Sequence, residues 1–247
     1  MCHSADERPR VRAVGGAASD HGDLVLTSAD GTRFAAYFAR AAHPSGSGMV
    51  IVPDSNGISQ FYTALARRFA EAGIDAVTID LYGRTAGPGL RPTGFNGDDH
   101  AGRTHPETVD QDVAAGAAYL RSADGGADKH VFCVGFCFGG AIAWRQSARG
   151  LDGGIGFYGW GQALRETVPD LKQIKAPVLL LVAGKDIYFT LDDSMLTDRK
   201  LEEAGVEHKT VVYDDAPHSF FSDGAHQETV DDAWRQVLEF VEASSKR

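Results

Sequence analysis

Short, fully apolar runs alternate with helical patterns along most of this chain. The apolar runs have the length and composition of buried parallel strands, and they cover residues 48–53, 75–80, 130–135, 153–159, 176–184 and 208–214. Apolar residues at helical spacing predict helices that begin near Phe61 and Pro106 and that cover residues 139–148, 191–204 and 227–244. Apolar strands that alternate with helices predict an α/β fold, with a mostly parallel sheet flanked by helices on both faces.

The N-terminal region departs from this alternation. Two β-like runs, residues 23–29 and 32–40, are separated by Asp30-Gly31, a dipeptide typical of tight hairpin turns. We therefore expect an N-terminal antiparallel hairpin at one edge of the sheet. Residues 1–20 are polar, rich in glycine and alanine and aperiodic, which predicts a flexible tail. Residues 21–247 suit a single domain, because a chain of 247 residues can bury one α/β core.

Composition narrows the classes of partner and compartment. The formal net charge is −10 and no long run of lysine and arginine occurs, so a nucleic-acid partner is not expected. No apolar run approaches the roughly 20 residues of a membrane span, and residues 1–16 lack the apolar core of a signal peptide. The 3 cysteines, Cys2, Cys133 and Cys137, indicate reduced thiols and no disulfide framework. We expect a cytoplasmic monomer or small homo-oligomer without a membrane contact.

The segment with the clearest chemistry is residues 135–140, Gly-Phe-Cys-Phe-Gly-Gly, which follows a predicted strand and opens a predicted helix. Its G-x-C-x-G spacing is that of a nucleophile elbow, with cysteine in the place of the usual serine. A sharp strand-to-helix reversal leaves no room for side chains two residues before and after the nucleophile, so Gly135 and Gly139 are required there. The helix N-terminus would favour the thiolate of Cys137, and the N–H group of Phe138 could bind an oxyanion.

A thiolate nucleophile also needs a base and an acid that orients the base. In the fold that uses this elbow, the acid and then a histidine follow the nucleophile along the chain. Asp186 comes just after the predicted strand 176–184, and His218 comes just after the predicted strand 208–214. Catalytic groups gather at that end of parallel strands. Asp186 could instead be a turn or helix-capping residue, with Asp192 and Asp193 as competing acids.

The sequence resembles the dienelactone hydrolase family of α/β-hydrolases. The matching segments occur in the family's order and are residues 53–58, 79–84, 134–144, 156–161, 183–190 and 216–221. The resemblance implies a Cys-His-Asp triad that acts on a small-molecule ester or lactone, above all cyclic enol esters. It assigns Cys137 as the nucleophile, His218 as the base and Asp186 as the partner of His218.

The same resemblance extends to the residues that would activate the thiol and bind the oxyanion. Asp54 falls at the position of an acid that contacts the resting thiol, and the N–H of Ser55 would complete the oxyanion hole with Phe138. The best-known family members have glutamate at the Asp54 position, and aspartate is one methylene shorter. Asp54 could equally belong to a turn with Asn56-Gly57.

Substrate-binding residues follow less directly from the sequence. Arg84, which comes after Tyr82 in residues 79–84, matches one of two family arginines that hold a substrate carboxylate. The second arginine position holds Ser222, so a carboxylate would lose one bidentate contact. Arg84 could also be a solvated loop charge. Tyr82, Trp160 and Phe221 are candidate substrate-binding aromatics, although core packing is the more common role for aromatic residues near a sheet.

A cysteine nucleophile predicts an acyl-thioester intermediate and needs neither a metal nor an organic cofactor. Asp98, Asp99, His100 and His105 share one loop but lack a recognised metal-ligand spacing. Two other classes of function remain open. The chain could be a thiol redox protein that cycles Cys133 and Cys137, or a catalytically silent binding module with the hydrolase fold.

Overall fold

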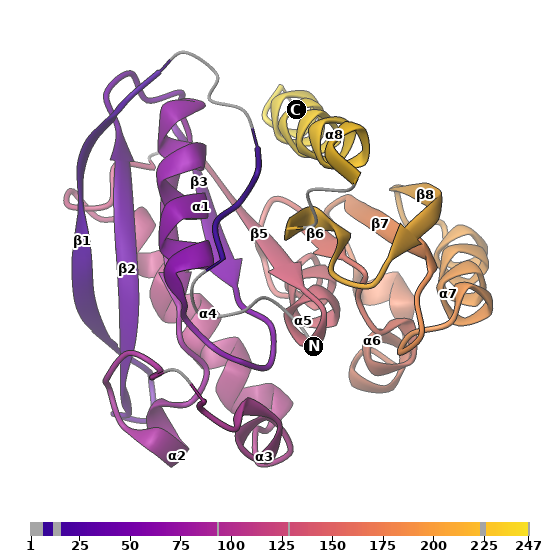
Figure 1. The fold of residues 1–247 in the computed structure, drawn as a ribbon, viewed down its shortest axis with the longest axis horizontal. Helices are drawn as coiled ribbons and strands as arrows, with labels where there is room; N and C mark the ends of the chain where they lie inside the picture. The colour runs from indigo at the N-terminus through magenta and orange to yellow at the C-terminus, as the bar shows by residue number, and fades with distance from the viewer. Residues whose placement is uncertain (1–6, 12–15, 93, 128, 223–225, 247) are drawn as a thin grey trace.

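The computed structural model describes residues 7–11, 16–92, 94–127, 129–222 and 226–246. Within these residues, eight strands form one sheet in the order β1-β2-β4-β3-β5-β6-β7-β8 (Figure 1). Strand β2 pairs antiparallel with β1 and with β4, and all other pairs are parallel. The strands are β1 (Ala18–Thr27), β2 (Arg33–Ala41), β3 (Ser47–Val52), β4 (Asp75–Ile79), β5 (His130–Phe136), β6 (Gly154–Phe157), β7 (Val178–Lys185) and β8 (His208–Pro217).

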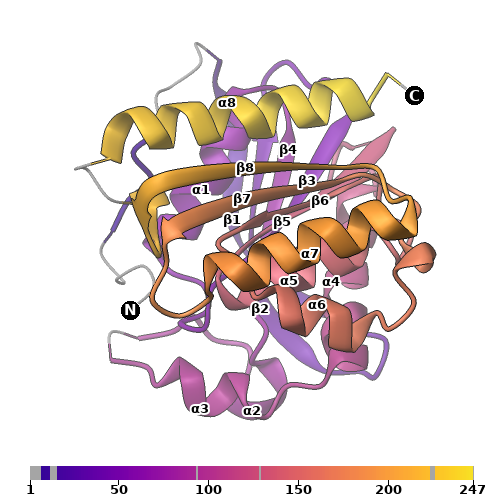
Figure 2. The ribbon, with the colours of Figure 1, turned by 90° about the vertical axis from the view of Figure 1, so that its right-hand side faces the viewer.

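Helices cover both faces of the sheet, as Figure 2 shows. One face carries α1 (Gln60–Glu71) and α8 (Gln227–Ser244). The other face carries α4 (Pro106–Leu120), α5 (Phe138–Gln146), α6 (Gly161–Thr167) and α7 (Leu191–Ala204). The shorter elements are α2 (Gly83–Ala86), α3 (Gly97–Ala101) and two 3-10 turns, η1 (Leu171–Gln173) and η2 (Phe220–Ser222). The predicted fold class is confirmed.

The central strands are apolar throughout because helices pack on both faces of the sheet. Successive side chains of a strand point to opposite faces of a sheet. In β3, Met49 and Ile51 pack into the core with α1 and α8, whereas Val50 and Val52 pack into the core with α4. All four side chains are fully buried. Because β3, β5, β7 and β8 run in the same direction, their C-terminal ends all lie at the same end of the sheet.

The N-terminal hairpin is confirmed, but the expected tail is wrong at its C-terminal end. Residues 18–20 belong to β1, where Asp20 pairs with Arg40 of β2. Val11 is also buried, with 3% of its surface exposed. A solvent-facing edge strand looks like a loop in the sequence because it buries too few side chains to show an apolar pattern. Residues 1–6 and 12–15 lie outside the described residues. We therefore propose that the domain begins before residue 21.

The other differences from the predicted elements lie near the C-terminal ends of the parallel strands. The polar stretch from Tyr82 to His105 contains α2 and α3, and α6 was not predicted. These helices are 4 to 7 residues long, too short to show a helical period. Strand β8 continues to Pro217, beyond the expected residue 214. None of the described helices is long and apolar enough to cross a membrane.

Candidate active site

Cys137 occupies a strained turn between β5 and α5. Its backbone has φ 54° and ψ −114°, a conformation that residues with a side chain rarely adopt. A Cβ atom on Gly135 would lie 1.9 Å from the carbonyl oxygen of Gly139, and a Cβ on Gly139 would lie 2.4 Å from that of Pro53. Both distances are far below van der Waals contact. The turn therefore requires glycine at the two positions of the elbow spacing.

The two described cysteines lie in very different surroundings. Cys137 is 8% exposed and lines a cavity, at the N-terminus of α5. The N–H groups of Phe138 and Gly139, in the first turn of α5, have no intrahelical acceptors. Cys133 lies within β5 and is completely buried, and this burial raises the pKa of its thiol. A thiolate is therefore disfavoured at Cys133, which argues against a redox pair with Cys137.

His218 and Asp186 form a buried hydrogen-bonded pair. The Nδ1 atom of His218 lies 2.6 Å from Oδ2 of Asp186, and the side chains are 4% and 2% exposed. A carboxylate can only accept, so Nδ1 carries the proton and the lone pair of the neutral ring is at Nε2. The other carboxylate oxygen, Oδ1, accepts the N–H groups of Tyr188 at 2.8 Å and Phe189 at 3.0 Å. These bonds fix the carboxylate, and the carboxylate in turn fixes the imidazole.

Residues with strained backbone conformations cluster around Cys137 and His218. The non-glycine residues with positive φ in the described part of the chain are Cys137, Tyr158 (φ 38°) and Ser219 (φ 64°). Ser219 follows His218 directly, and the ring of Tyr158 lies 4.9 Å from the ring of His218. Strained backbone persists where the surrounding structure holds it, typically at functional sites. The sequence held no signal for the strain at Tyr158 and Ser219, because neither is a residue type that favours positive φ.

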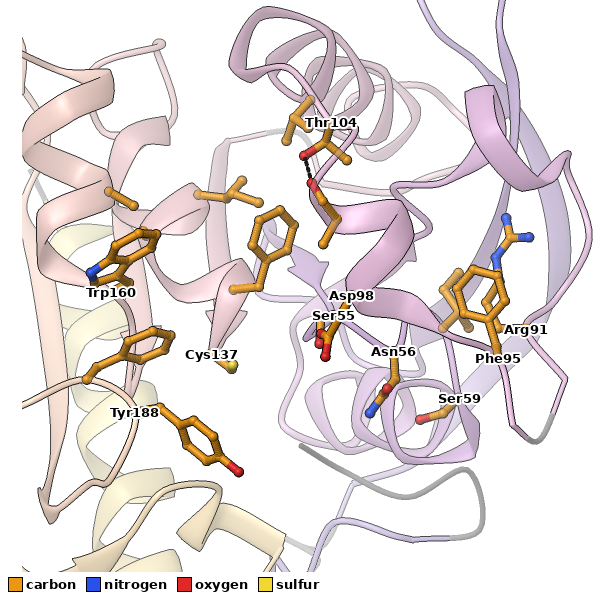
Figure 3. A pocket seen from close by; sticks show the side chains of 18 of the residues that line it. Ser55, Asn56, Ser59, Arg91, Phe95, Asp98, Thr104, Cys137, Trp160 and Tyr188 are labelled. Carbon is orange, nitrogen blue, oxygen red and sulfur yellow. Dashed lines mark hydrogen bonds between the residues drawn. The ribbon is translucent and has the colours of Figure 1, made fainter. Parts of the chain in front are cut away.

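Cys137 and His218 both line a cavity of about 1130 Å³. Figure 3 shows Cys137 between two different walls. Aromatic side chains form one wall, and they are Trp160, Tyr188 and Phe189. The rings of Trp160 and Phe189 are stacked, with an interplanar angle of 7°. The other wall carries Arg91, Phe95 and several polar side chains, which include Ser55, Asn56, Ser59 and Asp98. The cavity can therefore hold a partly apolar organic molecule against the thiol.

The turn after β3 places Ser55 in the lining of the cavity, across from Trp160 and Tyr188. Asp54 is completely buried, and its Oδ1 accepts the N–H of Asn56 at 2.8 Å. The hydroxyl of Tyr82 donates to the carbonyl oxygen of Ser55 at 2.8 Å. Asp54 thus has the turn role that its sequence context had left open, and it does not line the cavity. Its effect on the thiol stays a prediction.

Arg84 is placed away from the cavity, contrary to the expectation that it contacts substrate. Its guanidinium forms two hydrogen bonds with Asp112, at 2.6 and 3.0 Å, and one with Asp30 at 2.8 Å. Arg84 lowers the pKa of Asp30 to about 2. The sequence correctly placed Arg84 after a strand end, but it could not show that Asp112 of α4 and Asp30 of the hairpin turn would bind its side chain.

Two other expected substrate contacts are also buried elsewhere. Tyr82 and Phe221 are completely buried and do not line the cavity. The ring of Phe221 packs 4.4 Å from that of Phe157 in the core. Burial also raises the pKa of the Tyr82 hydroxyl. Of the four residues predicted to bind substrate, Trp160 lines the cavity.

Two arginines that the sequence did not single out do line the cavity. They are Arg91, in the loop between α2 and α3, and Arg145, on α5. Arg91 pairs with Asp80, and Arg145 pairs with Asp110. Arg91 lies in the Gly-rich polar stretch, where no periodic pattern marks which side chains turn inward. No group of three or more His, Cys, Asp or Glu residues in the described chain could hold a metal ion.

The sheet order, the strained cysteine at the strand-to-helix turn and the His218–Asp186 pair define an α/β-hydrolase. The sequence model of the Dienelactone hydrolase family matches residues 34–245, so the chain belongs to this family. The family resemblance seen in the sequence is therefore confirmed, and the protein is a hydrolase of the carboxymethylenebutenolidase class.

Relatives agree with this assignment across most of the chain. The chain is 29% identical over 208 residues to the carboxymethylenebutenolidase of Pseudomonas putida, which covers 80% of this chain and 84% of the relative. A solved structure from Klebsiella pneumoniae, named "Putative Dienelactone Hydrolase", has a TM-score of 0.77 at 24% identity, covering 91% of this chain and 99% of that one. A dienelactone hydrolase-like promiscuous phosphotriesterase from metagenomic libraries has a TM-score of 0.72 at 20% identity, covering 90% and 98%. These two structures share the fold.

Proposed function

We propose that this protein hydrolyses an activated ester or lactone through an acyl thioester on Cys137. The observation that carries the proposal is the buried hydrogen bond between His218 Nδ1 and Asp186 Oδ2 beside the cavity that Cys137 lines. This bond leaves Nε2 of His218 as the available base. A nucleophile, an oriented base and a cavity for the substrate are the parts that covalent acyl transfer needs.

In the first half of the reaction, the thiolate of Cys137 attacks the ester carbonyl carbon. The carbonyl oxygen becomes an oxyanion, which accepts hydrogen bonds from the N–H groups of Phe138 and Ser55. The tetrahedral intermediate then collapses, the bond from carbon to the leaving oxygen breaks, and the leaving group departs as an alkoxide or enolate. His218, which becomes an imidazolium when its Nε2 takes the thiol proton of Cys137, can protonate that oxygen.

In the second half, Nε2 of His218 takes a proton from water while the water oxygen attacks the thioester carbonyl. The carbon–sulfur bond breaks, the carboxylic acid leaves and the thiolate of Cys137 is restored. Asp186 holds the imidazole in the required tautomer and stabilises its charged form.

The choice of cysteine limits the leaving group. A thiolate leaves a tetrahedral intermediate more readily than an ordinary alkoxide does. The intermediate formed from an ester with a poor leaving group would therefore expel the thiolate and return to the starting ester. Enol lactones, aryl esters and thioesters avoid this return because their leaving groups are stabilised. We therefore propose these as the substrate class.

The experiment is mass spectrometry of the intact protein after brief exposure to 4-nitrophenyl acetate. The expected result is one added acetyl group on Cys137, together with turnover that Cys137→Ala abolishes. Cys133→Ala is the matched control, since this buried cysteine should leave labelling and turnover intact. A catalytically silent binding module would show neither acetyl labelling nor turnover. A redox protein that cycles Cys133 and Cys137 would lose its function in Cys133→Ala. Turnover that survives Cys137→Ala would overturn the proposal.

A further inference from the structure

Helix α5 lines the cavity with one of its faces, from its first turn to its last. Phe138, Ala141, Ile142 and Arg145 all line the cavity, and residues with this spacing lie on the same side of a helix. Phe138 directly follows Cys137, whereas Arg145 belongs to the last turn. Because a helix rises about 1.5 Å per residue, the Cα atoms of Phe138 and Arg145 are roughly 10 Å apart. The two residues between them are apolar.

Arg145 is buried, and one nitrogen of its guanidinium group is not hydrogen-bonded. The side chain is 4% exposed. Its Nε and Nη2 atoms lie 2.8 and 2.7 Å from Oδ1 of Asp110, and Nη2 also donates to the carbonyl oxygen of Pro106 at 3.1 Å. Nη1 has no hydrogen-bond partner among the described residues, and it is not sealed from solvent. The N–H groups of Nη1 are therefore available to a ligand in the cavity.

The charge of Arg145 is not cancelled by its aspartate, because Asp110 also binds a second arginine. Nε of Arg149 donates to Oδ2 of Asp110 at 2.9 Å. Asp110 thus faces two positive charges with one negative charge. Arg91, which also lines the cavity, is instead paired one to one with the buried Asp80. The uncompensated arginine charge of the lining therefore lies at Arg145.

The proposed reaction leaves the space along α5 to the acyl chain. The leaving oxygen faces His218, which protonates it, so the leaving group lies against the aromatic wall beside His218. The acyl chain then extends away from that wall. Figure 3 shows Tyr188 of the aromatic wall and Thr104 on opposite sides of the thiol. Thr104 comes two residues before Pro106, which binds Arg145, so the acyl chain extends toward Arg145.

We propose that Arg145 forms an anion subsite, and that the preferred substrate is an ester with a long acyl chain that ends in a carboxylate. The inference rests on the proposed ester hydrolysis and adds the nature of the acyl group. Nη1 of Arg145 donates to the carboxylate, while Ala141 and Ile142 contact the methylene groups of the chain. A carboxylate attached directly to a small lactone ring stays too close to Cys137 to reach Arg145. The subsite therefore selects for length as well as charge.

Half-esters of two dicarboxylic acids test this proposal. The probes are the mono-4-nitrophenyl esters of adipic and suberic acid, each compared with the same ester methylated at its far carboxylate. The leaving group and the reacting carbonyl are the same within each pair, so the intrinsic reactivities match. An extended suberic acid chain spans roughly 9 Å, close to the distance along α5. We expect kcat/KM of the wild type to be about tenfold higher for the charged suberate than for its methyl ester, and the shorter adipate pair to differ less.

The variant is Arg145→Gln, which removes the charge and keeps a side chain that can donate to Asp110. It should bring the two suberates to within about twofold of each other, and Arg145→Lys should restore part of the difference. Arg149→Gln should lower the preference by about twofold, since Asp110 then neutralises Arg145 alone. The matched control is Arg121→Gln, which removes an exposed arginine outside the cavity and should keep the wild-type preference.

The outcomes separate this inference from the proposed function. Equal kcat/KM for the two suberates in the wild type would overturn the anion subsite, as would a preference that Arg145→Gln leaves unchanged. A preference as large for adipate as for suberate would overturn the proposed length. In each case, Cys137-dependent cleavage of the esters would leave the proposed hydrolysis intact. Failure to cleave any of the esters, or cleavage that survives Cys137→Ala, would instead remove the proposed hydrolysis and this inference with it.

Discussion

The hydroxyl of Tyr82 donates a hydrogen bond to the backbone carbonyl oxygen of Ser55 across 2.8 Å. Tyr82 follows β4 and Ser55 follows β3, so the bond joins the ends of two neighbouring strands. Tyr82 is completely buried, which prevents bulk water from replacing its hydroxyl. The bond therefore fixes the turn whose N–H group, at Ser55, we propose as half of the oxyanion hole.

Tyr82→Phe should lower kcat by about fivefold to tenfold, with little change in KM, because a lost buried hydrogen bond costs about 1 kcal/mol and loosens the Ser55 turn. Steady-state kinetics on a 4-nitrophenyl ester would measure the change. Tyr213→Phe is the matched control, since its hydroxyl bonds to Asp232 away from the cavity. Equal kinetics of the two variants would contradict a positioning role for Tyr82.

Asp186→Asn should lower kcat/KM by about three to four orders of magnitude. An amide in this place favours the wrong tautomer of His218 and no longer stabilises the imidazolium, as a comparable change does in serine hydrolases. Stopped-flow or steady-state assays would measure the loss, and circular dichroism would check the fold. Asp215→Asn, which removes an exposed carboxylate paired with Lys185, should keep full activity. Activity within tenfold of the wild type would exclude Asp186 from the proposed triad.

Gly139→Ala should destabilise the protein by about 1–3 kcal/mol or more, because its Cβ would lie 2.4 Å from the carbonyl oxygen of Pro53. Urea unfolding followed by tryptophan fluorescence would measure the change in midpoint. Gly89→Ala is the matched control, since a Cβ there meets nothing within 4 Å. If both variants unfold at the same urea concentration, the elbow is less tightly packed than the structure implies.

Stability should fall as the pH rises above about 9. Burial raises the pKa of the Cys133 thiol from an ordinary value of 9.0, and it raises the pKa of the Tyr82 and Tyr213 hydroxyls from 10.0. Above these ordinary values the unfolded chain loses protons that the folded chain keeps, so ionisation favours unfolding. Urea midpoints between pH 7.5 and 10.5 would show the decline, and Cys133→Ala should make it less steep. A flat profile over this range would contradict the prediction.

Much of this protein was predictable from short-range patterns in the sequence. Apolar runs such as residues 130–135 are read directly as buried strands, because burial on both faces demands apolar residues at every position. The elbow was equally readable, since the sharp turn at Cys137 tolerates glycine alone at Gly135 and Gly139. The edge strand β1 was partly missed because it buries few side chains, and α2, α3 and α6 were missed because they are too short to be periodic.

The sequence by itself determined the fold class, the family and the order of Cys137, Asp186 and His218 along the chain. Those features depend on local composition and on residue spacing, which are properties of the chain alone. Only the tertiary structure decided which side chains face the cavity. Arg84 turns to Asp112, while Arg91 and Arg145 reach the cavity already paired. The direction of a long side chain is set by partners that are distant in sequence and become neighbours only on folding.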